Sequence, residues 1–201
     1  MSVKEYLTRY LSSFMSEEKA LSCADALMKA YGSLPLIAST SAEVIADTVG
    51  VSIDTALNIK LLGYVYSRSI TDDFTFGRTY SDDEIKKYLI ALFTGRHVET
   101  VYCISLDKQG RVTASDCLGV GIVNASEISA RIVVECACKR GASSIILAHN
   151  HPKGTANASN QDISSTNIIK NVLSTLGIEL LEHYLVSETD CISVGEQIGR
   201  I

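Results

Sequence analysis

The sequence predicts a mixed α/β domain, in which helices flank a mixed β-sheet, preceded by a small all-helical domain. Apolar residues recur at helical spacing through about the first 70 residues. From about residue 97 the pattern changes to short runs rich in β-branched and aromatic residues, which is typical of strands. Two further stretches with helical spacing lie between the later strands, so sheet and helices share the second half of the chain.

The helices expected in the N-terminal domain are bounded by turn and capping signals. Residues 32–35 (Gly-Ser-Leu-Pro) and 48–52 interrupt the helical pattern, and residues 39–41 stand where an N-cap belongs. We expect four helices, near residues 3–14, 17–31, 41–48 and 53–68. The domain is placed at residues 1–75, and residues 71–80 lose helical periodicity and form the expected linker.

Residues 80–201 are expected to form the second domain. Ser81 and Glu84 make a capping box that opens a helix ending near residue 93. Turn signals at residues 107–110, at Gly141 and at Gly177 separate the elements that follow. These are strands near 99–106, 111–116 and 118–124, a helix over 127–140, a buried strand over 143–148, a helix over 160–176, and closing strands over 178–187 and 191–194.

Composition narrows the possible classes of protein. Apolar residues make up 46% and charged residues 20% of the 201 residues, which argues against disorder. The formal net charge of −5 lowers the expectation of strong nucleic-acid binding, which needs a basic face. No apolar stretch approaches the ~20 residues of a membrane helix, and the N-terminus has no secretory pattern. We therefore expect no membrane association and a cytoplasmic location, where the cysteines stay reduced.

The residues that carry chemistry follow the strand predicted over 143–148. His149 and His151 are two apart, so in an extended strand they project to one face while Asn150 projects to the other. Two imidazoles at the end of a buried strand are natural metal ligands, and Asp162, at the start of the next helix, can supply a third. His₂Asp leaves the fourth position of Zn²⁺ open for water, whose pKa can fall to about 7. We predict one Zn²⁺ per chain and a hydrolytic nucleophile.

The same residues also admit a structural interpretation. Ser159-x-x-Asp162 is a plain helix-capping pattern, and two histidines at a strand end can be surface residues. Asp162 is expected to serve as both cap and ligand only if its carboxylate turns away from the backbone.

A hydrolytic site also needs a general base near the water. Glu99, Glu127 and Glu135 are the candidates. Glu127 precedes a helix and can simply favour its N-terminus, and Glu135 lies in mid-helix, where a solvated face is usual. Glu99 starts an apolar strand, where an exposed glutamate is also common. Spacing alone leaves the choice open.

The sequence resembles a known family at this point. His149-x-His151, seven residues, then Ser159-x-x-Asp162 resembles the signature of the JAMM (MPN+) metalloproteases. His-Asn-His-Pro-x-Gly over 149–154, preceded by Ile-Ile-Leu-Ala, is similar to the bacterial RadC branch. The resemblance extends over about residues 80–201 and includes residues 106–107, 124–127 and 177–183.

This resemblance implies a JAMM fold, which is similar to the cytidine-deaminase core, with zinc held by His149, His151 and Asp162. It implies that Glu99 is the acid and base acting through the water, and that Ser159 stabilises the oxyanion. A peptide or isopeptide bond of a protein or peptide is the implied substrate. The chain departs from the RadC pattern at Lys153, Ala156, Ala158 and Ile132. Fewer prolines predict a looser loop before Asp162.

The N-terminal domain suggests a competing hypothesis. Residues 49–56 resemble the turn of a helix-hairpin-helix, which RadC proteins carry, but Ser52 replaces its second glycine and Asp47 and Asp54 flank it. DNA binding through backbone N–H groups and a purely helical packing or protein-contact role both remain open. A DNA-associated repair or scaffold protein with a vestigial metal site is thus the alternative. A zinc deaminase is not expected, because the chain has no Pro-Cys-x-x-Cys motif. A two-metal nuclease is not expected either, because the chain has no cluster of carboxylates.

Overall fold

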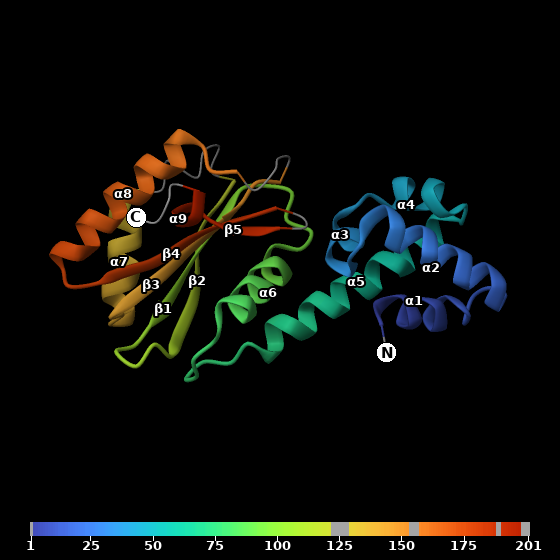
Figure 1. Cartoon of the computed structure of the whole chain (residues 1–201), viewed down its shortest axis with the longest axis horizontal. Coiled ribbons are helices and arrows are strands. Elements are labelled where there is room, and N and C mark those ends of the chain that lie inside the picture. The colour runs from blue at the N-terminus through green and yellow to red at the C-terminus, as the bar shows by residue number, and fades with distance from the viewer. Residues whose placement is uncertain (1, 122–128, 153–156, 188–189, 198–201) are drawn as a thin grey trace.

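The computed structural model describes residues 2–121, 129–152, 157–187 and 190–197. It confirms the predicted fold class. A group of helices at the N-terminal end is followed by a mixed α/β region built on a five-stranded sheet, and the two lie beside each other along the long axis of the molecule (Figure 1).

Serine caps set the starts of the N-terminal helices. The side chains of Ser2, Ser33, Ser41 and Ser52 each accept a hydrogen bond from a backbone N–H in the first turn that follows. The helices are α1 (Val3–Leu11), α2 (Glu17–Tyr31), α3 (Leu34–Ser39), α4 (Ala42–Val49) and α5 (Ile53–Asp73). Helix α3 was not predicted. Pro35 lies in its first turn, where a missing N–H costs no hydrogen bond, so the proline opens a helix here.

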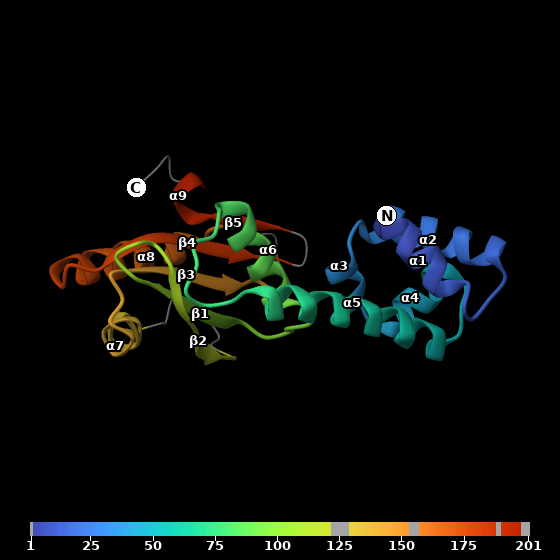
Figure 2. The same ribbon diagram turned by 90° about the horizontal axis from the view of Figure 1, so that it is seen from below.

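Helix α5 connects the two regions (Figure 2). It continues to Asp73, beyond the predicted end at residue 68, so residues 71–73 of the predicted linker are helical. Helix α6 (Asp82–Phe93) follows, with the predicted capping box of Ser81 and Glu84. The hydroxyl of Ser67 donates to Thr94 Oγ1 at 3.1 Å, and Ser39 Oγ accepts from Gly95 N at 3.1 Å. These bonds join the N-terminal helices to the end of α6.

The sheet has the strand order β2-β1-β3-β4-β5, in which only β3 and β4 run parallel. The strands are β1 (Thr100–Leu106), β2 (Val112–Val120), β3 (Ser144–Asn150), β4 (Glu179–Val186) and β5 (Cys191–Ser193). The separate strand predicted near 118–124 is wrong for its described part, because β2 runs unbroken to Val120. A register shift opposite Val101 and Tyr102 disturbs the alternation there, as a β-bulge does.

Helices cover both faces of the sheet (Figures 1 and 2). Helices α7 (Ala130–Arg140) and α8 (Asn160–Thr175) pack against one face with Ile145 and Leu147, and α6 packs against the other with Ile146 and Ala148. The short helix α9 (Val194–Gln197) follows β5. The burial of β3 on both faces explains its continuous apolar run. Within the described residues, no helix has both the length and the apolarity needed to cross a bilayer.

Candidate metal centre

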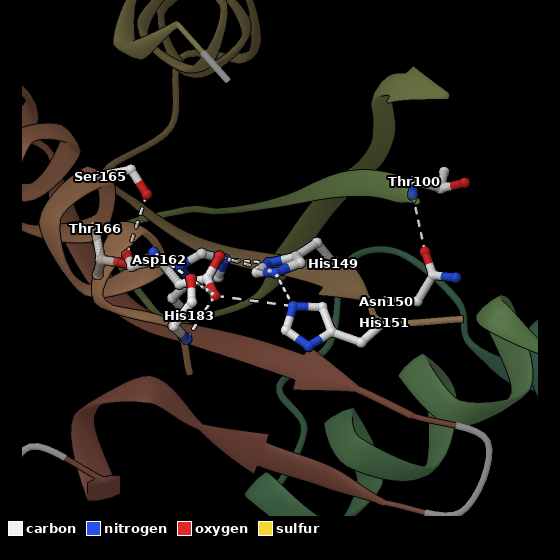
Figure 3. A network of polar contacts seen from close by, with 9 residues as sticks. Thr100, His149, Asn150, His151, Asp162, Ser165, Thr166 and His183 are labelled. Atoms are coloured by element: carbon white, nitrogen blue, oxygen red, sulfur yellow. Dashed lines mark hydrogen bonds and ion pairs between the residues drawn. The ribbon is translucent and has the colours of Figure 1, made fainter. Parts of the chain in front are cut away.

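Three side chains converge at the end of β3, as the sequence predicted. His149 Nε2 lies 3.0 Å from His151 Nε2 and 3.2 Å from Asp162 Oδ1, and His151 Nε2 lies 3.8 Å from Asp162 Oδ2. One potential ligand atom from each residue lies within 4.8 Å of the others. Figure 3 shows the two rings and the carboxylate pointing toward one another. Tetrahedral Zn²⁺ with ligands at 2.0–2.1 Å separates those ligands by about 3.3 Å, so the spacing fits one small cation.

The backbone fixes where each histidine points. His149 pairs with Val101 on β1 and Leu185 on β4, and the N–H of His151 continues the contact with β4 by donating to Val186 O at 2.9 Å. The extended conformation therefore persists through His151, which keeps both rings on the face covered by α8. His149 is fully buried, whereas the His151 side chain is 19% exposed. Solvent can reach the site from the His151 side.

Asp162 serves as helix cap and as candidate ligand at the same time. Its Oδ2 accepts hydrogen bonds from the backbone N–H of Ser159 at 2.8 Å and from the Ser159 hydroxyl at 2.6 Å, while Oδ1 faces His149. The carboxylate need not turn away from the backbone to be available to a metal, because its two oxygens can bond in different directions. Burial raises the pKa of Asp162, but the neighbouring His149 and the hydrogen bonds from Ser159 outweigh burial and hold that pKa well below its usual range.

A second row of buried polar groups lies behind His149. Thr166 Oγ1 donates to the carbonyl of Asp162 at 2.6 Å and lies 2.7 Å from His183 Nδ1. His183 Nε2 in turn lies 2.9 Å from His149 Nδ1. All four residues are at least 96% buried, as their exposed fractions of 4% or less show. Burial, together with the neighbouring His149, lowers the pKa of His183 to about 3, so its ring is neutral.

The proton positions along this row follow from counting donors. Two oxygens 2.6 Å apart need a proton between them, and the carbonyl of Asp162 has none, so the Thr166 hydroxyl donates there. Thr166 Oγ1 must then accept from His183 Nδ1–H, which leaves His183 Nε2 as an acceptor for His149 Nδ1–H. In a neutral His149 ring, Nε2 is then the nitrogen without a proton. A lone pair of His149 thus faces the Asp162 carboxylate, an arrangement that a cation between them stabilises.

Asn150 projects to the opposite face, as predicted, and ties down the segment before β1. Its Oδ1 accepts from Thr100 N at 2.8 Å, and its Nδ2 donates to the carbonyls of Arg96 and Val98 at 3.2 Å each. Glu99 belongs to this segment. It lies two residues before Val101, which pairs with His149 at the end of the β1–β3 ladder.

The structure describes only some of the remaining predicted residues. Glu135 is exposed on α7 and forms an ion pair with Arg131, so the solvated interpretation holds for it. Glu127, Lys153 and Ala156 lie outside the described residues. Of the other departures from the RadC pattern, Ala158 packs with Leu185 and Val194, and Ile132 is exposed on α7.

Sequence reasoning gave no role to His183, Thr166 or Asn150. Two signals were available: His183 is one of only four histidines, and Thr166 is four residues from Asp162, which places it on the same face of a helix. Neither signal shows that His183 lies beside His149, because that contact depends on the parallel pairing of β3 with β4.

The turn between α4 and α5 has an ordinary helix-capping geometry. Gly50 ends α4 with φ 63°, and Ser52, with φ −68°, caps α5 by accepting from Thr55 N. Its backbone does not need a second glycine. Asp47 and Asp54 are exposed beside the turn, and Lys60 Nζ donates to the carbonyl of Thr40 instead of pointing toward the turn.

Comparisons with known proteins agree with this geometry. The RadC-like JAB domain matches residues 79–199. A UPF0758 protein of Aliivibrio salmonicida is 29% identical over 199 residues, covering 96% of this chain and 87% of the relative. A UPF0758 protein of Vibrio cholerae serotype O1 is 28% identical over 198 residues, covering 98% of this chain and 88% of the relative. The match covers more than half of the chain, on the segment that holds His149, His151 and Asp162, and the chain therefore belongs to the RadC-like JAB domain family.

Proposed function

We propose that this protein is a zinc-dependent hydrolase of the metallopeptidase class. The convergence of His149 Nε2 with His151 Nε2 and the Asp162 carboxylate carries the proposal. Two imidazoles and one carboxylate match the donor set of catalytic zinc sites, which keep one position for water or substrate. When bound, Zn²⁺ would supply Lewis acidity and a water of lowered pKa.

Glu99 is the proposed acid and base. The Asn150 side chain fixes the backbone on both sides of Glu99, which supports a positioned carboxylate. In the proposed reaction Glu99 takes the proton of the attacking water and passes it to the leaving amine. The resemblance to JAMM proteases supports this role, and so does the place of Glu99 two residues before Val101, which pairs with His149.

Ser159 is the proposed donor to the oxyanion. At present its hydroxyl donates to Asp162 Oδ2 at 2.6 Å. Ser159 is exposed, so its side chain can turn toward a substrate carbonyl, while the Ser159 backbone N–H keeps Asp162 Oδ2 in place. The hydroxyl can therefore donate to the oxyanion of the substrate while the backbone N–H of Ser159 still holds the Asp162 carboxylate.

A protein or peptide is the proposed substrate, because the family resemblance points to a peptide or isopeptide bond. The DNA-associated alternative has less support. The helix-hairpin-helix-like turn presents Asp47 and Asp54 where a phosphate would approach, and Lys60 is held by Thr40. Retardation of duplex DNA at low salt that disappears as salt rises would favour the alternative.

Metal analysis and one active-site variant test the proposal together. We expect about one zinc per chain after reconstitution, lost in His151→Ala. Glu99→Gln should keep the zinc but lose cleavage of a library of fluorescence-quenched peptides, because the amide cannot accept the proton. A zinc-free wild-type protein would refute the metal centre. Unchanged cleavage by Glu99→Gln would remove Glu99 from the reaction and leave the metal centre standing.

A further inference from the structure

Helix α5 has two faces of different character. Its buried face consists of Ala56, Ile59, Gly63 and Ser67. The approach there is close, since a Cβ at Gly63 would lie 2.5 Å from the carbonyl oxygen of Leu34 and 2.8 Å from Ala38 Cβ. This face packs against α3, α4 and the end of α6, so the fold itself does not require any apolar side chain on the other face.

The other face nevertheless carries an apolar ridge, which we define as Leu57, Leu61 and Val65. These residues follow one another at intervals of four, which aligns them along one side of a helix. Their exposed fractions are 50%, 56% and 58%. Scattered apolar residues on a surface are ordinary, but an aligned row in mid-helix marks an interaction surface. Ile53 and Tyr64, 44% and 38% exposed, widen the row on one side.

Residues of opposite charge lie at the two ends of the ridge. Asp54 and Arg68 lie on the same side of the helix, three residues before Leu57 and three residues after Val65. Asp54 is exposed, and the Arg68 side chain is 77% exposed. Arg68 also contacts Asp72 at 2.9 Å, but an exposed i,i+4 pair is weak, and a guanidinium has donors for a second carboxylate.

We propose that the chain associates with a second copy of itself through antiparallel contact of the two α5 helices. A two-fold axis at Leu61 brings Leu57 opposite Val65 of the second copy, because both lie four residues from the axis. The same axis brings Asp54 opposite Arg68, because both lie seven residues from it, and the symmetry repeats this ion pair at the other end. A parallel arrangement would instead oppose Asp54 to Asp54 and Arg68 to Arg68.

The charge pattern also argues against a membrane as the occupant. Helices that lie on membranes carry lysine and arginine beside their apolar face. Here Asp54 and Asp72 border the ridge, and the chain has a net charge of −5. Because one pair of helices buries little area compared with the roughly 1,200 Å² or more of a stable interface, we expect a reversible dimer with a micromolar dissociation constant. The proposal does not depend on the metal centre.

Sedimentation velocity over a range of micromolar concentrations tests the dimer. Leu61→Asp places two carboxylates together at the axis and should weaken association by about tenfold or more. Val44→Asp is the matched control, because Val44 is 51% exposed on α4, away from the ridge, and it should leave association unchanged. Circular dichroism melting checks that each variant is folded.

A charge exchange tests the antiparallel orientation. Asp54→Arg alone and Arg68→Asp alone should each weaken association, and the double variant should restore it, because the opposite charges meet again. A wild-type chain that stays monomeric, a dimer unaffected by Leu61→Asp, or a double variant no better than the single ones would overturn the proposal. A monomer that binds anionic vesicles through Leu61 would overturn it too and assign the ridge to a membrane surface.

Discussion

His183 lies against His149, with the two ring nitrogens Nε2 and Nδ1 2.9 Å apart inside the protein. The contact joins β4 to β3 and reaches the candidate ligand from the side opposite the metal position. Because Thr166 fixes the proton on His183 Nδ1, His149 is held in the tautomer whose Nε2 lone pair faces Asp162. Outer partners of this kind orient a metal-binding imidazole and raise its basicity.

Removing the Thr166 hydroxyl should therefore weaken metal binding at a residue that cannot itself hold the ion. Thr166→Val keeps the shape of the side chain but leaves His183 Nδ1–H without an acceptor, so His183 can adopt the other tautomer and no longer select that of His149. We expect zinc affinity to fall by roughly 10-fold, within the range known for outer-shell changes. Competition with a chromophoric chelator measures it.

The matched control for this variant is Thr166→Ser, which retains the hydroxyl and should stay near wild type. His183→Ala should weaken zinc binding at least as much as Thr166→Val. Equal zinc affinities for Thr166→Val and Thr166→Ser would show that the contacts from Thr166 through His183 do not set the tautomer of His149.

Zinc should also stabilise the fold, because the unfolded chain cannot bring together residues from β3 and α8. Free zinc at 100 times its dissociation constant adds about 2.7 kcal/mol to the free energy of unfolding. For a chain of this size that is a rise in Tm of roughly 5–10 °C. Differential scanning calorimetry with and without a chelator measures the rise, and His151→Ala should show almost none of it. An equal rise in that variant would locate the zinc effect elsewhere.

The sequence predicted that two histidines share one face at the end of β3, because alternation is a local property of an extended chain and needs only His149, Asn150 and His151. It predicted the helix over 160–176 between the Ser159-x-x-Asp162 capping pattern and Gly177, and the helix spans Asn160–Thr175. The contact between His183 and His149 could not be predicted in the same way. His183 is 34 residues from His149, and which two residues of parallel strands meet depends on a register that the pattern does not encode.

Two other differences between the sequence predictions and the structure have local physical causes. Helix α3 was missed because Pro35 was taken as a break, although a proline in the first turn is compatible with a helix. The orientation of Asp162 was judged too narrowly, because a cap needs only one carboxylate oxygen and the second oxygen remains available to a metal. In both cases the residue was recognised correctly and its geometric freedom was underestimated.

Acid should destabilise the pair formed by Asp116 on β2 and Arg140 on α7. The hydrogen bond from Arg140 outweighs burial and lowers the pKa of Asp116. A carboxyl whose pKa is lower in the folded chain stabilises it above the unfolded pKa, and that contribution is lost as the pH falls through the folded pKa. Asp116→Asn should therefore lose less stability than wild type on acidification below about pH 4. Urea unfolding over a pH series measures the difference, and parallel curves for the two proteins would contradict it.

Variants of Asn150 separate the effect on zinc affinity from the effect on the position of Glu99. Asn150→Ala removes an acceptor from Thr100 N and a donor from the carbonyls of Arg96 and Val98, which should cost about 1–3 kcal/mol of unfolding free energy. Because this side chain projects away from α8, zinc affinity should change by less than a few-fold. Turnover should fall, since the segment that carries Glu99 is no longer tied to the end of β3. Asn150→Asp, which keeps only the acceptor, should give an intermediate fall in turnover. If Asn150→Ala lost zinc as completely as His151→Ala does, Asn150 would be supporting the ligands themselves, and the division of labour between the two faces of β3 would be wrong.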